Sequence, residues 1–172
     1  MGTKNLSEQL LETWRTNNQV TEFFVAQLPD ELWNLKIPGT SQKTIRMLLG
    51  HLHNARCMWI KMTGNQFNIR PPRNVDRRRV SKAALLQALR KSNEAMVDLL
   101  QSALSYGLLP MNFPFANIPS DATHFMAYMI AHEAHHRGQI VLAARQLGQR
   151  LPEKITSGLW QWKKMHKLHS KK

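Results

Sequence analysis

The strongest constraint on the fold is a set of four long segments in which apolar residues recur every three or four positions. This period places the apolar side chains on one face of an α-helix, which must then pack against another helix. The segments cover about residues 6–28, 41–62, 81–107 and 120–148. No stretch shows the alternating pattern of a half-buried strand. The pattern therefore predicts an all-α protein.

Residues typical of helix ends separate these segments. Pro29 ends the first segment, Gly64 is a plausible cap for the second, and Ser81 is the expected N-cap of the third. The fourth begins near Ser120 or Asp121. Four long amphipathic helices and a short one favour a four-helix bundle.

Two longer connections and one short helix complete the predicted architecture. The connections are residues 64–80 and the proline-containing stretch 109–119. The short helix covers about residues 153–168 and is expected to dock Leu159, Trp160 and Trp162 on the bundle.

The length and composition fit one domain that covers residues 1–172 and ends in a basic tail at about residues 163–172. No apolar run approaches the roughly 18 residues of a membrane span, and the N-terminus lacks the apolar stretch of a signal peptide. Cys57 is the single cysteine, which excludes an intrachain disulfide and favours a reducing compartment. We therefore expect a cytoplasmic location and no membrane span.

The formal net charge of +13 is concentrated in the connection and the tail. The clustered residues are Arg70, Arg73, Arg77, Arg78 and Arg79, and Lys163, Lys164, Lys167, Lys171 and Lys172. Such clusters can attract nucleic acid, an anionic membrane or acidic metabolites. Interleaved aromatic residues and a recognised DNA-binding motif are absent, so we interpret the clusters mainly as solvated charge.

Two histidines interrupt the apolar stripe of the fourth segment. His132 and His136 are four residues apart, which places their side chains about 40° apart around a helix and about 6 Å apart along it. Two imidazoles in this arrangement can bind one metal ion, and that binding compensates for their removal from water. The pair predicts a metal site inside the bundle.

A site with an open coordination position usually has three protein ligands. The second segment offers His51, which lies about 70° from the centre of its apolar stripe, and His53, which lies about 130° from it. His51 is therefore the preferred third ligand, and His53 is expected to face outward or toward a helix border. His124 and His135 lie away from the stripe of the fourth segment by the same measure.

Asn17 and Ser92 are polar residues within the apolar stripes of the first and third segments. Polar groups buried at one depth on separate helices predict a polar pocket across the bundle, where such folds build their sites. Both residues are therefore candidates to line a pocket near the histidines. The alternative is that each makes an ordinary hydrogen bond in the core.

The sequence HEAHH at residues 132–136 also matches the H-E-x-x-H pattern of zinc peptidases, in which the glutamate activates water. We do not favour this interpretation, because no strand is predicted to bind a peptide and Glu153 belongs to a separate segment. Glu133 flanks the apolar stripe by about 60°. It could assist as a base, but we interpret it mainly as an exposed charge.

The motifs HEAHHRGQI, GHLHNARCMWI and GLWQW together resemble the DinB (damage-inducible) family of the DinB/YfiT-like superfamily. The resemblance extends over essentially the whole chain, and its most specific part is H-x-x-x-H-R-G-Q combined with the histidine of L-x-H-L. It implies an up-down-down-up four-helix bundle, usually a homodimer, in which three histidines bind a divalent metal. The matching residues are His51, His132 and His136, the same three that the helical angles select.

The resemblance implies a divalent transition metal, which is zinc, nickel, iron or manganese in different relatives. Characterised relatives include transferases and isomerases that use low-molecular-weight thiols such as bacillithiol or mycothiol. We therefore interpret the chain as a metal-dependent enzyme that activates a thiol or water for attack on a small electrophile, as a thiol S-transferase or a hydrolase-like enzyme. Glu133 and Gln139 are candidates to contact the ligands, and Arg137 could position a neighbour. The alternatives are a non-catalytic metal- or ligand-binding stress protein and a nucleic-acid binder.

Overall fold

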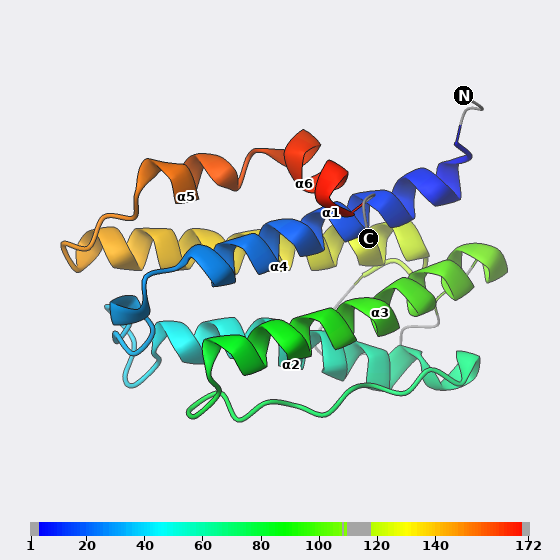
Figure 1. The fold of residues 1–172 in the computed structure, drawn as a ribbon. Helices are drawn as coiled ribbons and strands as arrows, with labels where there is room; N and C mark the ends of the chain where they lie inside the picture. The colour runs from blue at the N-terminus through cyan, green and yellow to red at the C-terminus, as the bar shows by residue number, and fades with distance from the viewer. Residues whose placement is uncertain (1–3, 108, 110–117, 170–172) are drawn as a thin grey trace.

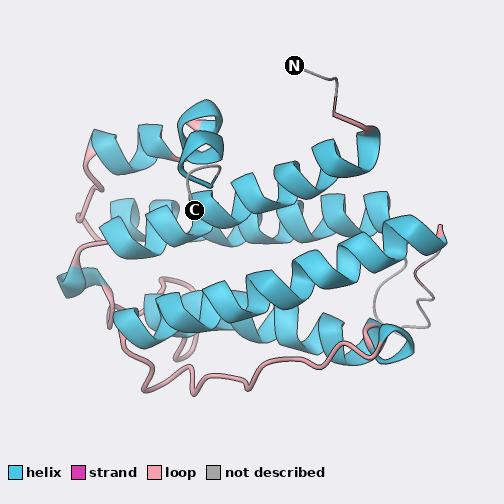
Figure 2. Ribbon diagram, turned by 45° about the vertical axis from the view of Figure 1, so that its right-hand side comes forward, coloured by secondary structure: helices cyan, strands magenta, loops and turns pink. Residues whose placement is uncertain are grey.

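The computed structural model describes residues 4–107, 109 and 118–169. In these ranges the chain is helical and has no strand, apart from one isolated bridge between Lys36 and Thr44 (Figure 2). The helices are α1 (Leu6–Gln27), α2 (Ile45–Thr63), α3 (Lys82–Tyr106), α4 (Ala122–Gln146), α5 (Glu153–Gly158) and α6 (Trp162–His169), with short 3-10 helices at Asp30–Leu32 and Asn65–Phe67. The all-α prediction is confirmed.

The four long helices form a bundle in the predicted up-down-down-up order. In Figure 1, α1 and α4 run in one direction, and α2 and α3 run in the opposite direction. Because α2 and α3 are parallel, residues 64–80 must return along the length of the bundle, as Figure 1 shows. This returning connection carries the arginine cluster.

Side-chain caps define the start of each long helix. The side chains of Asn5, Thr44, Ser81 and Asp121 each accept a hydrogen bond from a backbone N–H three residues later. The second helix therefore begins at Ile45, four residues later than the apolar pattern predicts. The caps at Ser81 and Asp121 agree with the sequence prediction.

The described core contains two apolar clusters at opposite ends of the bundle. One includes Phe24, Leu49, Leu85 and Ile140, and the other includes Trp14, Trp59, Leu99 and Phe125. Each long helix contributes to both clusters and carries buried polar residues between them. We call these residues the polar layer: Asn17, Asn18, Thr21, Glu22, His53, Arg56, Ser92, Glu133 and Arg137.

The predicted fifth helix is two short helices, α5 and α6, which pack on α1 (Figure 1). α5 ends at Gly158, where the backbone approaches Phe23 of α1: a Cβ added to this glycine would lie 2.4 Å from Cε1 of the ring. Glycine weakens helices, so the interruption is consistent with the sequence. The close approach explains why no larger residue fits there.

The docking residues of this segment differ from the prediction. Ile155 and Met165 are buried, and Leu159 and Trp162 are partly buried. Trp160, which was expected to dock, is 83% exposed. It lies in the turn between α5 and α6, where the helical period that predicts its direction no longer applies.

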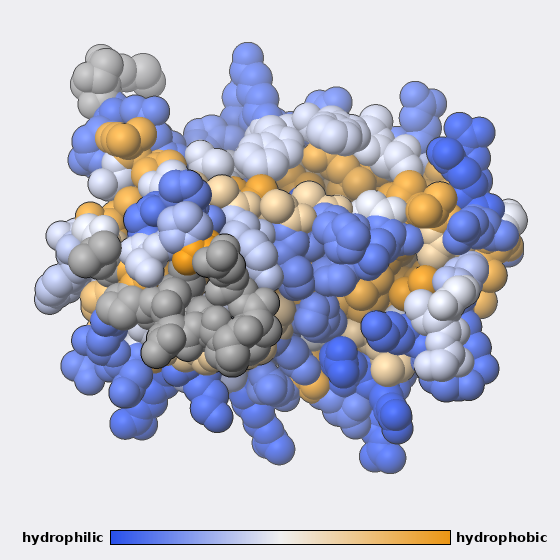
Figure 3. Space-filling model, turned by 180° about the vertical axis from the view of Figure 1, so that it is seen from behind, coloured by the Kyte–Doolittle hydropathy of each residue, from blue (hydrophilic) through white to orange (hydrophobic). Residues whose placement is uncertain are grey.

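The face of the molecule seen in Figure 3 carries both hydrophilic and hydrophobic areas. Figure 3, which views the molecule from behind, shows hydrophilic side chains around the outline with hydrophobic areas between them. Among the described helices, none is both long enough and apolar enough to cross a membrane. Most of the predicted connection at 109–119 lies outside the described residues, as do Lys171 and Lys172 of the basic tail.

Candidate metal centre

Three histidine rings from two helices converge beside the polar layer. His51 extends from α2, and His132 and His136 extend from adjacent turns of α4. The Nε2 atom of His132 lies 3.2 Å from Nε2 of His51 and 3.1 Å from Nε2 of His136. All three side chains are half-buried, and one nitrogen from each lies within 4.8 Å of the others. The structure therefore brings together the three residues selected from the sequence.

The spacing of these nitrogens fits a single small cation. Histidine nitrogens bound to a tetrahedral ion at about 2.0–2.1 Å lie about 3.4 Å from one another. The observed separations of 3.1 and 3.2 Å are close to that value. Imidazole ligands suit zinc, copper, iron and nickel, so the cluster could hold a metal ion but does not select one.

Gln139 determines which ring nitrogen of His136 is unprotonated. Nδ1 of His136 lies 2.8 Å from Oε1 of Gln139, so the ring donates its Nδ1–H to the amide oxygen. Nε2 of His136 is then unprotonated and directed toward the other histidines. Gln139 thus makes the contact with a histidine that the sequence suggested. On the same helix, the Tyr128 ring stacks against His132 with centroids 6.2 Å apart.

The environment keeps all three rings neutral. Burial, followed by the neighbouring His136 and His132, lowers the pKa of His51 to about 4. Burial is also the main reason that the pKa values of His132 and His136 are lowered from 6.5. A histidine must be neutral to bind a metal, so the cluster is ready to do so at neutral pH.

Glu133 lies on the bundle side of α4 and is fully buried, so the prediction of an exposed charge is wrong. Its Oε1 accepts a hydrogen bond from Arg56 Nε at 2.7 Å. Its Oε2 accepts from Asn17 Nδ2 at 2.9 Å and from the Thr21 hydroxyl at 2.7 Å, and Arg137 lies 3.6 Å away. Burial alone would raise the pKa of Glu133, but the two arginines outweigh it and the pKa is lowered.

The two arginines connect Glu133 to the neighbouring helices. Arg137 donates to the Thr21 hydroxyl at 2.6 Å and to Asn17 Oδ1 at 3.1 Å. Arg56 donates to Asn18 Oδ1 at 2.8 Å, and its guanidinium lies over a Trp14 ring. These bonds join α1, α2 and α4 at the depth of the histidines. They therefore fix the relative positions of the helices that carry the three rings.

The hydrogen bonds that the Glu133 carboxylate accepts argue against the peptidase interpretation. In that chemistry the glutamate must reach a water molecule beside the metal. Here both carboxylate oxygens accept hydrogen bonds inside the bundle. Arg137 is also buried, among the partners of Glu133. It therefore joins helices inside the bundle rather than facing an open site.

His53 is fully buried at the border between α2 and α3, which is one of the two positions expected from the sequence; it does not face outward. Its Nε2 lies 3.0 Å from the Arg73 carbonyl, to which it donates, and its Nδ1 lies 3.1 Å from the Ser92 hydroxyl. The residue therefore joins α2 to α3 and to the returning connection. The helical angles could not indicate its complete burial, because this side of α2 is also covered by the returning connection, which has no helical periodicity. His124 and His135 are exposed, in line with their predicted positions.

A hollow of about 170 Å³ opens beside the cluster. It is lined by Lys43, Met47, Leu48, His51, Arg77 and His136. Asn17 and Ser92 are not among these lining residues; both lie in the polar layer, bonded to Glu133 and His53 respectively. Lys43 was not a candidate from the sequence, and Arg77 was expected to belong to a solvated cluster. Neither residue lies in a helix, so no periodic pattern could have placed it here.

Comparisons with known proteins agree with this architecture. The sequence model of the DinB family matches residues 1–163, a range that contains all four long helices and the three histidines. The solved structure of a DinB-like protein from Bacillus cereus ATCC 10987 is similar, with a TM-score of 0.62 and 28% sequence identity. The similarity covers 84% of this chain and 95% of that chain. No curated protein matches the sequence.

Proposed function

The chain belongs to the DinB family, and from this membership and the convergence of three imidazoles we propose that it is a metal-dependent enzyme acting on a small molecule. His51, His132 and His136 would hold one divalent transition ion, which is zinc, nickel, iron or manganese. The observation that carries the proposal is the spacing of 3.1 and 3.2 Å between neutral Nε2 atoms. Unprotonated histidine nitrogens at this distance are stabilised when they bind one shared cation.

The proposed reaction is the attack of a thiol or a water molecule on a small electrophile. When bound, a divalent ion supplies a Lewis acid that lowers the pKa of a thiol or water ligand. Gln139 would keep Nε2 of His136 unprotonated, and the polar layer would hold the two helices in register. The hollow leaves room for a ligand beside His51 and His136, and its Met47 and Leu48 side chains exclude part of the water. These features favour a thiol S-transferase or a hydrolase-like enzyme.

Metal analysis of protein purified without affinity metals tests the site. We expect about one ion per chain in the parent protein and almost none in His132→Ala. His135→Ala is the matched control, because it removes an exposed histidine from the same helix and should keep the ion. Equal metal content in His132→Ala and the parent would overturn the proposed site.

Turnover assays separate the enzyme from a metal- or ligand-binding protein without catalysis. The metal-loaded protein should consume an electrophile in the presence of a low-molecular-weight thiol, or hydrolyse it, faster than the metal-free protein does. Metal-loaded protein that consumes none with any cellular thiol or with water would favour the non-catalytic alternative.

A further inference from the structure

The hollow beside the histidine cluster carries two cationic side chains and no acidic one. Its charged lining residues are Lys43 and Arg77, both of which are exposed. Within the described part of the chain, neither forms an ion pair with a carboxylate. Two unpaired cations at the mouth of a small hollow attract an anion.

Arg77 reaches this position because Gly50 has no side chain. A Cβ added to Gly50 would lie 3.1 Å from Cγ of Arg77 and 3.4 Å from its Cα. The returning connection therefore lies directly against α2, one residue before His51. A side chain at this position would press against the arginine and force it to shift.

Hydrogen bonds on both sides of Arg77 attach the returning connection to α2. Asn54 and Val75 form a reciprocal pair, in which Asn54 Nδ2 donates to the Val75 carbonyl at 3.0 Å and Val75 N–H donates to Asn54 Oδ1 at 2.9 Å. Arg46 donates to the Arg78 carbonyl at 2.6 Å. The backbone that carries Arg77 is thus held at residues 75 and 78, so the arginine is placed by defined contacts.

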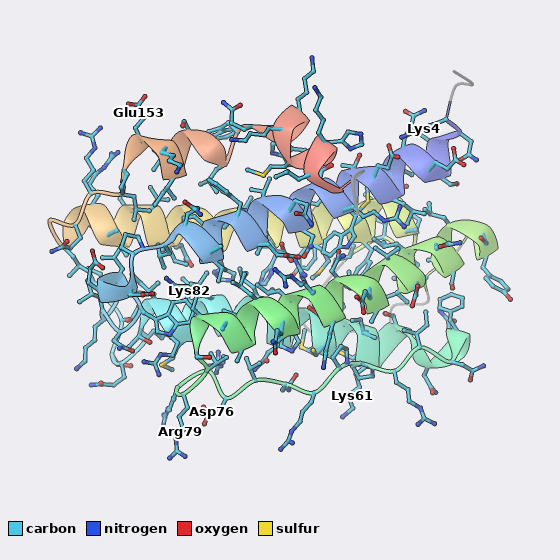
Figure 4. All side chains as sticks on the ribbon, viewed as in Figure 1. Lys4, Lys61, Asp76, Arg79, Lys82 and Glu153 are labelled. Carbon is cyan, nitrogen blue, oxygen red and sulfur yellow. The ribbon has the colours of Figure 1, made fainter. Side chains whose placement is uncertain are left out.

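The acidic residue next to Arg77 is engaged elsewhere. Asp76 Oδ1 accepts from the Arg78 N–H at 2.9 Å, and Asp76 Oδ2 lies 3.8 Å from Arg79 Nε. In Figure 4, Asp76 and Arg79 lie at the outer edge of the returning connection and point away from the bundle. Asp76 therefore leaves the Arg77 charge uncompensated at the hollow.

The second cation, Lys43, is also held by its backbone. The Lys43 carbonyl accepts a hydrogen bond from the Ile37 N–H at 2.8 Å, and the next residue, Thr44, is the N-cap of α2. Lys43 and Arg77 line the same hollow as His51 and His136. Both cations are therefore placed to act on a ligand beside those rings.

We propose that the small molecule bound at the histidine cluster is an anion, and that Lys43 and Arg77 bind its negatively charged oxygens while another of its atoms faces the histidines. The inference rests on the proposed metal site and names the class of substrate. An arginine fork and a lysine suit a planar carboxylate or a tetrahedral oxyanion. The two cations would select among thiols by the charge of the group that accompanies the sulfur.

Cobalt(II)-loaded protein provides a binding test that does not depend on turnover. The probes are 3-mercaptopropionate, its neutral amide 3-mercaptopropionamide, and 2-mercaptoethanesulfonate, and the readout is the change in cobalt absorption. We expect at least one anionic thiol to bind about tenfold more tightly than the amide at low ionic strength, and added salt to reduce the difference. Comparison of carboxylate with sulfonate identifies the shape of the preferred anion.

Three variants locate the effect. Arg77→Gln and Lys43→Gln should each remove most of the preference for the anionic thiol and leave the cobalt content unchanged. Arg70→Gln removes the same charge from the same connection, but Arg70 does not line the hollow, so the preference should persist. An equal loss in Arg70→Gln and Arg77→Gln would assign the preference to overall charge and overturn the inference.

The outcomes distinguish this inference from the proposed function. Cobalt stoichiometry is measured before any thiol is added, and failure to bind cobalt would overturn both proposals. Full cobalt binding with equal affinity for the anionic and neutral thiols, or with no binding of either, would overturn the anion site and leave the metal site intact.

Discussion

Nε of Arg56 lies 2.7 Å from Oε1 of Glu133, and both side chains are completely buried at the centre of the bundle. Arg137 Nη1 lies 3.6 Å from the same carboxylate, so the negative charge of Glu133 interacts with two guanidinium groups. A buried ion pair adds little stability over a well-packed apolar pair, but removal of one partner leaves an uncompensated charge. The polar layer is therefore sensitive to the loss of the Glu133 carboxylate.

Glu133→Gln should lower the free energy of unfolding by about 3–5 kcal/mol, because two buried guanidiniums then lack a counter-charge. Urea denaturation of the metal-free protein measures the change. Glu153→Gln is the control, since this exposed glutamate should alter stability by less than about 0.5 kcal/mol. Similar midpoints and slopes for Glu133→Gln and the parent would show that the buried pair contributes nothing.

Replacement of His53 should affect stability but not metal content. His53→Phe removes the hydrogen bonds to the Arg73 carbonyl and the Ser92 hydroxyl, which costs about 1–3 kcal/mol. His51→Phe should instead abolish metal binding. Elemental analysis and urea denaturation of both variants distinguish the two roles. Loss of the ion from His53→Phe alone would mean that the ligand on α2 has been assigned to the wrong residue.

Gln139→Leu should weaken metal binding by about 10–100-fold, because His136 loses the acceptor that fixes its protonation. The affinity is measured by competition with a chelator. Gln146→Leu makes the same change at an exposed position at the end of α4 and should have no effect. Unchanged affinity in Gln139→Leu would show that His136 does not need this contact.

Metal affinity should depend little on pH near neutrality. The pKa of His51 is lowered to about 4, and a lowered pKa disfavours the protonated ring, so protons compete with metal only in acid. His132 and His136 are shifted in the same direction. Chelator competition should give a nearly constant affinity for cobalt(II) from about pH 8 to about pH 6.5 and a decline on further acidification. A steep fall between about pH 8 and about pH 7 would contradict the neutral, pre-formed cluster.

Substitution by alanine should have opposite effects on stability at Gly158 and at Gly138. Gly158→Ala should destabilise the protein by about 1–3 kcal/mol, because the new methyl group meets the Phe23 ring. At Gly138 an added Cβ has nothing within 4 Å, so alanine should stabilise α4 by up to about 1 kcal/mol. Thermal unfolding of both variants measures the difference. Destabilisation of Gly138→Ala would indicate that a second molecule covers this face, as the expected homodimer allows.

Features with local causes could be predicted from the sequence. The helices follow from apolar periodicity and from caps such as Ser81 and Asp121, which act within one turn. The approach of His51 to His132 and His136 could be inferred from angles on two helices, because both helices remain regular through these residues.

Features that depend on contacts with other segments could not be predicted from the sequence. Glu133 and Arg137 rank as surface residues by hydropathy, and their burial becomes favourable only through their mutual ion pair and through partners on other helices: Arg56 on α2, and Asn17 and Thr21 on α1. For that reason they occupy the most buried side of α4, and the two histidines lie at its border. Arg77 was inaccessible to prediction because the path of the returning connection has no period.

Because Asn54 holds the returning connection, substitutions around the histidine cluster fall into two groups with different structural consequences. Substitutions at the histidines or in the polar layer disturb the packing of several helices at once. A substitution at Arg77 changes one exposed side chain on a backbone that the Asn54 amide keeps in place. The side chain beside the histidines can therefore change while the helical framework that positions the three rings stays as it is.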